Sequence, residues 1–171
     1  MADRDTCGAA GRRRRWSAVA LAGLVALAVA SGATAGATQN TKLSTAERAF
    51  RKAYVALVPN LNAASTAIIT AVRNAGKDTD AQVVTIFTRL ARQWTTATRP
   101  LLALKAPAPD TGLFAAVTTR VPKVEADLLA TAQAGRTHSV SAGKTAGEHL
   151  ATDFNALGVA VGALKKRLGL P

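Results

Sequence analysis

A Gly-Lys-Thr segment is the part of the sequence that comes nearest to a known catalytic motif. Gly143, Lys144 and Thr145 match the end of a phosphate-binding loop, in which backbone amides curl around phosphate. That loop needs another glycine five residues before the first one, and this position is His138. No strand precedes the segment either, although the motif requires one. We therefore interpret the segment as a chance match.

The histidines His138 and His149 are the next candidates, as metal ligands or as groups that transfer protons. His138 falls in a predicted loop, whereas His149 comes four residues before Asp153, so those two side chains share a helical face. A metal site usually needs three or four ligands, and the sequence shows no cluster of that size. The Glu-x-x-His pattern of di-iron bundles is also absent. We predict no metal ion and no cofactor.

Other catalytic side chains are equally scarce. The chain after residue 35 has only three glutamates, Glu47, Glu125 and Glu148, and the single cysteine, Cys7, precedes it. Serines and threonines are plentiful, but none lies in a nucleophile elbow. No pair of carboxylates stands out for acid–base work. The sequence therefore predicts that the protein has no catalytic site and is not an enzyme.

Four apolar stripes with helical spacing organise the rest of the chain. In the last stripe the steps alternate between four and three residues, which is the spacing of a helix that presents one face to its neighbours. Its members are Gly143, Gly147, Leu150, Phe154, Leu157, Val161, Leu164 and Leu168. The glycines of this region should let a neighbouring helix approach closely, which favours a tight core over a roomy cavity. They are Gly143, Gly147, Gly158 and Gly162.

These stripes predict an all-α, antiparallel up-down-up-down four-helix bundle, because short loops join long helices. The helices are expected near residues 44–75, 79–105, 111–134 and 140–168. The first should begin with a capping box formed by Ser44 and Glu47 and should continue through a kink at Pro59. Pro122 should kink the third helix. Nearly all aromatic residues fall on the stripes instead of among surface cations, so we predict no nucleic-acid partner.

The N-terminal residues have the pattern of an export signal. A run of four arginines starting at Arg12 precedes the uncharged apolar residues 16–30, and a small-x-small pattern follows, with cleavage expected between Ala35 and Gly36. The predicted parts are a signal peptide over 1–35, a tether over 36–43 and the bundle over 44–171. The alternative is an uncleaved anchor, since the apolar run is just long enough to span a bilayer. Both outcomes predict an extracytoplasmic protein, which is membrane-anchored if cleavage does not occur.

Positive charge gathers at one end of the predicted bundle. The net charge of the chain is +12, and an up-down-up-down order brings the starts of helices one and three to the ends of helices two and four. That end has two acidic residues, Glu47 and Asp110, and eight cations: Arg48, Arg51, Lys52, Arg99, Lys105, Lys165, Lys166 and Arg167. Cations complement the dipole at helix C-termini, but in the first turns of a helix the dipole disfavours them. We therefore predict that this end contacts an anionic surface.

The leading hypothesis for function is a non-enzymatic envelope protein that acts by binding. Its expected partner is an anionic lipid, an anionic cell-wall polymer or another protein. The alternative is a small-molecule carrier or sensor-type bundle that opens between its helices near Pro59 and Pro122. The sequence leaves the oligomeric state open, because the same stripes also permit pairing between chains.

Overall fold

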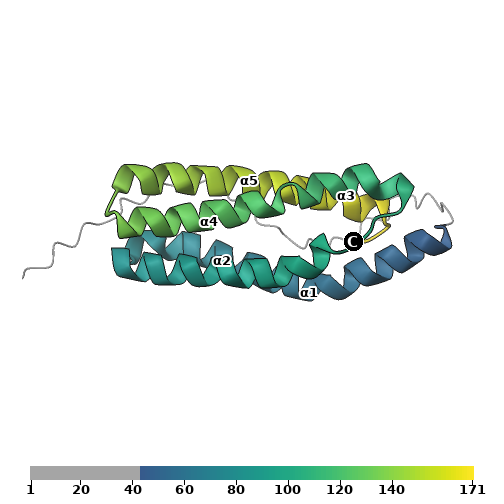
Figure 1. The fold of residues 1–171 in the computed structure, drawn as a ribbon, viewed down its shortest axis with the longest axis horizontal. Coiled ribbons are helices and arrows are strands. Elements are labelled where there is room, and N and C mark those ends of the chain that lie inside the picture. Colours follow the sequence, from purple (N-terminus) through teal and green to yellow (C-terminus); the bar gives the residue numbers. More distant parts are fainter. Residues whose placement is uncertain (1–42) are drawn as a thin grey trace, which may run out of the picture.

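The structure, a computed structural model, describes residues 43–171, and every regular element in that range is helical (Figure 1). In chain order the elements are α1 (Thr45–Asn74), the 3-10 turn η1 (Ala75–Lys77), α2 (Asp80–Leu102), the 3-10 turn η2 (Ala108–Asp110), α3 (Thr111–Thr118), α4 (Val121–Arg136) and α5 (Val140–Arg167). The predicted signal peptide, its cleavage site between Ala35 and Gly36, and almost all of the predicted tether lie outside the described residues.

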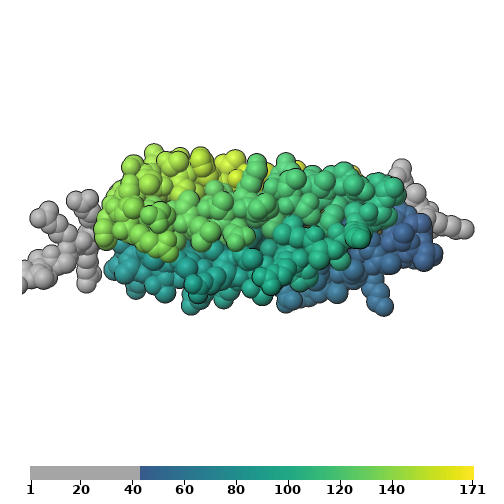
Figure 2. Space-filling view, viewed as in Figure 1, coloured from purple at the N-terminus to yellow at the C-terminus, as the bar shows by residue number. Residues whose placement is uncertain are grey.

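The helices form an elongated bundle with four helical positions (Figures 1 and 2). Helices α3 and α4 follow each other end to end and share one of these positions. The most extensive contacts join α4 to α2 and α4 to α5, and α3 packs on α5. Helix α1 approaches chiefly α2. The prediction of an all-helical fold is confirmed, and α1 makes few contacts for a helix of 30 residues.

The third predicted helix, expected over 111–134 with a kink, is instead two helices. Pro122 lies in the first turn of α4, where a missing N–H costs nothing. Farther inside a continuous helix its ring would clash with the preceding turn, so the chain stops and restarts. The Arg120 guanidinium donates to the Ala116 carbonyl oxygen at 2.6 Å and so caps the end of α3.

The other predicted bounds differ less from the structure. Helix α2 ends at Leu102 and not near residue 105, two residues after Pro100 has removed a donor from its last turn. Helix α1 continues through Pro59, as predicted, and Figure 1 shows its N-terminal half inclined to the rest of the bundle. Helices α1 and α5 match their predicted ends to within one residue.

Gly135 marks a close approach between two helices and does not end α4, which continues to Arg136. A Cβ atom on Gly135 would lie 3.0 Å from Val84 Cγ2 and 3.1 Å from the Asp80 carbonyl oxygen. The expected close approach on α5 is wrong for Gly147 and Gly162, where an added Cβ would meet nothing within 4 Å. Of Gly135, Gly147 and Gly162, only Gly135 therefore lies close to a neighbouring helix.

The core is well buried where α2, α3 and α4 pack together and less well buried between α1 and α5. The stripes of α2, α3 and α4 are mostly buried, and the Trp94 indole N–H donates to the Val121 carbonyl oxygen at 3.0 Å. On α1, by contrast, the stripe residue Leu61 is only half-buried, as is Val161 on α5. The apolar stripes of α1 and α5 therefore do not bury each other completely.

Helix α1 also has the composition of a membrane-crossing segment. The segment Thr45–Lys77 is the one helix in the described part of the chain that is long and apolar enough to cross a membrane, and only 11% of its apolar window is buried. A core helix with this composition would be mostly buried. Most large apolar side chains of α1 are instead half-buried, and Val55 is the one that is exposed.

Candidate functional site

Three segments that are far apart in the sequence meet at one end of the bundle. Arg167 on α5 joins them, because its Nη2 lies 2.6 Å from Glu47 Oε1 and its Nε lies 3.2 Å from Asp110 Oδ1. Both carboxylates are buried, and Arg167 supplies the charge that offsets their removal from water. Neither oxygen of Asp110 accepts a hydrogen bond within the described residues, so the ion pair is what balances that carboxylate.

Glu47 is held by a second set of contacts at the start of α1. The Ser44 backbone N–H donates to Glu47 Oε2 at 2.7 Å, and the Glu47 N–H donates to the Ser44 hydroxyl at 3.2 Å. These bonds form the predicted capping box, which is confirmed. The contacts with Ser44, helped by the charge of Arg167, lower the pKa of Glu47. The carboxylate therefore stays ionised and anchors Arg167.

In the described part of the chain, six further cations lie within five residues of Glu47, Asp110 or Arg167 in the sequence, and together with Arg167 we call them the basic end. Its members are Arg48, Arg51, Lys52, Lys105, Lys165, Lys166 and Arg167. With Glu47 and Asp110 the formal charge is seven positive against two negative, or +5. Apart from Arg167, no member lies within ion-pair distance of a carboxylate among residues 43–171. Six cations therefore remain available to an external anion.

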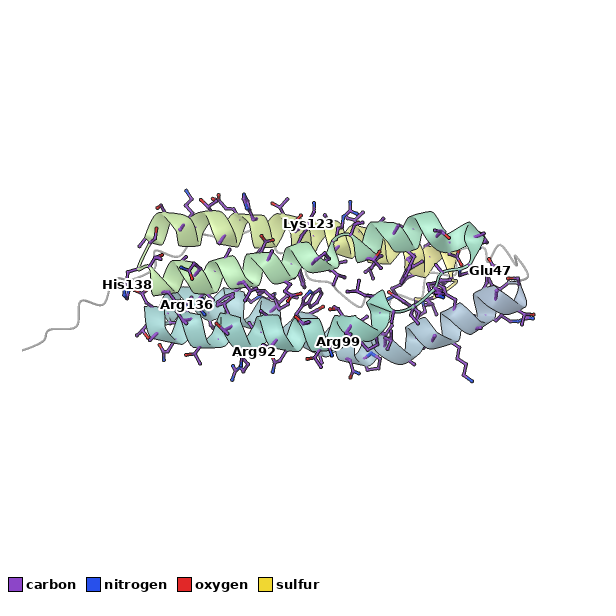
Figure 3. All side chains as sticks on the ribbon, viewed as in Figure 1. Glu47, Arg92, Arg99, Lys123, Arg136 and His138 are labelled. Carbon is purple, nitrogen blue, oxygen red and sulfur yellow. The ribbon has the colours of Figure 1, made fainter. Side chains whose placement is uncertain are left out.

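The members of the basic end differ in exposure. Four of them are exposed, namely Arg48, Lys52, Lys105 and Lys166, whereas Arg51 and Lys165 are half-buried. Arg51 donates to the Gly169 carbonyl oxygen at 3.3 Å, which fixes it near the end of α5. Figure 3 shows Arg99 set back from Glu47 toward the middle of the bundle, so we leave Arg99 out of the basic end.

Exposed apolar residues adjoin the basic end on α1. Val55 is 43% exposed, and Ala56 and Pro59 are exposed as well. They follow Lys52 within two helical turns. A surface that combines cations with exposed apolar side chains fits the head-group region of a membrane.

A cavity of about 80 Å³ lies where α1 faces α5. Val58, beside Pro59, and Val121, beside Pro122, both line it. Two opposing expectations apply here, since the mid-helix prolines predict an opening and the glycines of α5 predict a tight core. The glycine argument is wrong at Gly147 and Gly162, where an added Cβ would meet nothing within 4 Å.

The Gly-Lys-Thr segment lies inside α5 and not in a loop. The Gly143 N–H already donates to the Ser139 carbonyl oxygen at 3.0 Å, so it is not aimed at a phosphate. At the other end of the molecule from Glu47, His138 Nδ1 lies 2.6 Å from Asp80 Oδ2 (Figure 3). Among the residues that the structure describes, no group of three or more His, Cys, Asp and Glu side chains could hold a metal ion.

The structure brings together one carboxyl pair that sequence reasoning missed. Asp127 on α4 is nearly buried, and the Asp153 carboxyl on α5 faces it. Burial, and then the charge of Asp153, raise the pKa of Asp127, while His149 and Lys123 oppose that rise. One signal was present in the sequence, since Asp127 follows Val124 by three residues and so lies beside the apolar stripe of its helix.

No protein-family model, curated protein or solved structure matches this chain. Its function therefore has to be inferred from the chemistry of the basic end and of the cavity.

Proposed function

We propose that this protein is a non-enzymatic, extracytoplasmic binding protein, an up-down-up-down bundle whose basic end contacts an anionic surface of the cell envelope. The observation that carries this proposal is the pairing of charges at that end. Arg167 takes both carboxylates, Glu47 and Asp110, and the other six cations have no carboxylate partner among the described residues. Six positive charges without partners inside the protein create a positive electrostatic field, which attracts an anionic surface.

The apolar surface of α1 favours lipid over a cell-wall polymer as that partner. Each Lys or Arg near an anionic membrane contributes about 1 kcal/mol, and exposed apolar side chains such as Val55 add burial at the head-group boundary. A polar polymer would gain nothing from Val55. An N-terminal anchor that escapes cleavage would hold the same end of the bundle at the membrane, because α1 begins there.

The test replaces only exposed cations that form no ion pair among residues 43–171. The end variant changes Arg48, Lys52, Lys105 and Lys166 to Gln, which leaves Arg167 in place. The matched control makes the same charge change at four exposed cations away from the basic end: Arg73, Lys77, Arg89 and Arg92. Both are compared with the unaltered protein, in the form that its host accumulates, for binding to vesicles with anionic or zwitterionic lipids.

We expect the end variant to lose at least about a hundredfold in affinity for anionic vesicles, since four contacts of about 1 kcal/mol each are removed. The control should lose less than a tenth of that. Equal losses in the two variants would contradict the proposal. If anionic vesicles fail to bind the unaltered protein while an acidic protein or polymer does, the partner is not lipid.

A second candidate function is a small-molecule carrier or sensor. The observation that favours it is the cavity between α1 and α5, which lies at the level of Pro59 and Pro122. A ligand that binds only the folded protein raises its melting temperature. This candidate does not depend on the exposed cations of the basic end.

A further inference from the structure

Helices α1 and α5 border the same cavity but make few close contacts with each other, and we call this junction the α1–α5 seam. Helix α4, by contrast, packs extensively on both α2 and α5, and α1 is attached chiefly to α2. Val58 and Leu61 on the α1 side of the cavity are half-buried, and so is Val161 on the α5 side. If α1 moved away from α5 and stayed on α2, the extensive contacts of α4 would remain.

Polar contacts close the seam at the basic end. Arg167 on α5 pairs with Glu47 on α1 at 2.6 Å, and Arg51 on α1 donates to the Gly169 carbonyl oxygen, just after α5, at 3.3 Å. Each contact depends on an arginine, and a guanidinium group also binds phosphate well, often through two hydrogen bonds. The phosphates of an anionic membrane at the basic end therefore compete with Glu47 and Gly169 for these arginines.

Both helices of the seam have long uncharged stretches beside the basic end. Residues 53–72 of α1 and 154–164 of α5 contain no Asp, Glu, Lys or Arg, and Lys52 and Lys165 flank them. The side chains of these stretches that line the cavity include Tyr54, Leu61, Leu157 and Val161. A helix that is apolar on one face and carries cations elsewhere lies in the plane of a membrane, with the apolar face at the boundary between head groups and acyl chains.

We propose that contact with an anionic membrane opens the α1–α5 seam, so that the apolar stripes of α1 and α5 enter the boundary between head groups and acyl chains. The inference rests on the proposed function, because the membrane reaches Arg51 and Arg167 through the basic end. The apolar side chains that separate at the seam are buried again in lipid, which offsets the cost of opening.

Trp94 reports the opening without an added label. It lines the cavity beneath α1 and is buried, and its indole N–H bond to the Val121 carbonyl oxygen fixes it to α4. Trp16→Phe removes the other tryptophan if the form that the host accumulates retains it. On anionic vesicles whose acyl chains carry a nitroxide quencher, Trp94 of the bound protein should lose most of its fluorescence. The same vesicles without nitroxide give the reference.

A cross-link across the seam separates opening from surface binding. Val58→Cys and Gly158→Cys place thiols at the cavity on α1 and α5, Cys7→Ser removes the native thiol, and a short bismaleimide joins the new pair. The matched control is the same variant with each thiol capped by a monofunctional maleimide. Both forms should sediment with anionic vesicles, but Trp94 should be quenched only in the capped form, as it is in the unaltered protein.

The contact between Glu47 and Arg167 is tested by Glu47→Gln. Gln removes the charge that pairs with Arg167 but can still complete the capping box at the start of α1. Glu148→Gln makes the same charge change at an exposed position and is the matched control. Glu47→Gln should shift the quenching of Trp94 to a lower fraction of anionic lipid, whereas Glu148→Gln should behave as the unaltered protein does.

Three results would overturn the inference: an unaltered, vesicle-bound protein whose Trp94 is not quenched, equal quenching in the cross-linked and capped forms, or equal dependence on anionic lipid in Glu47→Gln and Glu148→Gln. A protein that sediments with anionic vesicles but keeps its Trp94 fluorescence overturns only the opening of the seam. A protein that does not sediment with them overturns the proposed lipid partner as well.

Discussion

At the scale of single residues, Arg167 has the largest structural role that the described contacts reveal. It pairs with two buried carboxylates, Glu47 and Asp110, that come from different helices. Removing one partner of a buried ion pair leaves uncompensated charge and costs about 3 kcal/mol or more. We therefore expect Arg167→Met to destabilise the protein by about 3 kcal/mol, measured by chemical denaturation. Lys166→Met, at an exposed position, should change stability by less than about 0.5 kcal/mol; equal effects would refute this role.

Asp127 should make stability depend on pH in the direction opposite to that of an ordinary surface carboxylate. Its pKa is raised, chiefly by burial and by Asp153, so the folded state holds the proton more tightly than the unfolded state. Its contribution is therefore most favourable below the ordinary Asp pKa of about 3.9 and is lost as pH rises through the raised pKa of the folded state.

Asp127→Asn removes this titration. We expect the substitution to raise the melting temperature at neutral pH, with a gain that shrinks as the pH falls toward the ordinary Asp pKa. Glu148→Gln, which changes an exposed carboxylate on α5, is the control and should show no such trend. A gain from Asp127→Asn that is the same at every pH would exclude a raised pKa as its cause.

At the scale of helices, Gly135 and Gly147 predict opposite effects of the same substitution. A Cβ on Gly135 would lie 3.0 Å from Val84 Cγ2 and 3.1 Å from the Asp80 carbonyl oxygen, whereas one on Gly147 would meet nothing within 4 Å. Gly135→Ala should destabilise the protein by about 1–3 kcal/mol through overpacking. Gly147→Ala should stabilise it by about 0.5–1 kcal/mol, since alanine favours helix. Thermal unfolding of the two variants tests these opposite effects. If Gly135→Ala stabilised the protein, α2 and α4 could separate without cost, which would contradict the prediction.

The same glycines show which features of the fold the sequence could predict. Apolar spacing located the four helical positions and most of the core, because burial of a stripe depends on the periodicity of its own segment. Whether a neighbour approaches Gly135 or Gly147 depends on the partner helix, which local spacing does not contain. The stop and restart at Pro122 was predicted only as a kink, since the donors that cap α3, such as Arg120, depend on the local geometry of the break.

At the scale of the whole molecule, the sequence predicted the excess of cations but not how they are used. An up-down order placed Arg167 among cations that face outward, yet the structure uses it to hold Glu47 and Asp110. Arg99 was expected at the same end, but α2 stops early and Figure 3 shows Arg99 set back. The cavity depends on how closely α1 packs on α5, which is a property of the assembled bundle. Its cation, Lys165, was therefore recognised in the sequence only as part of the basic cluster.

The central claim, that the basic end binds an anionic surface, is tested most directly by a salt titration of vesicle binding. Surface charges are screened strongly above about 0.1 M salt, where the screening length is about 10 Å. We predict that the affinity of the unaltered protein for anionic vesicles falls steeply as salt rises through this range. The variant with Gln at positions 48, 52, 105 and 166 should bind weakly and depend little on salt. Binding by the unaltered protein that does not change with salt, or a variant with the same steep dependence, would contradict the account.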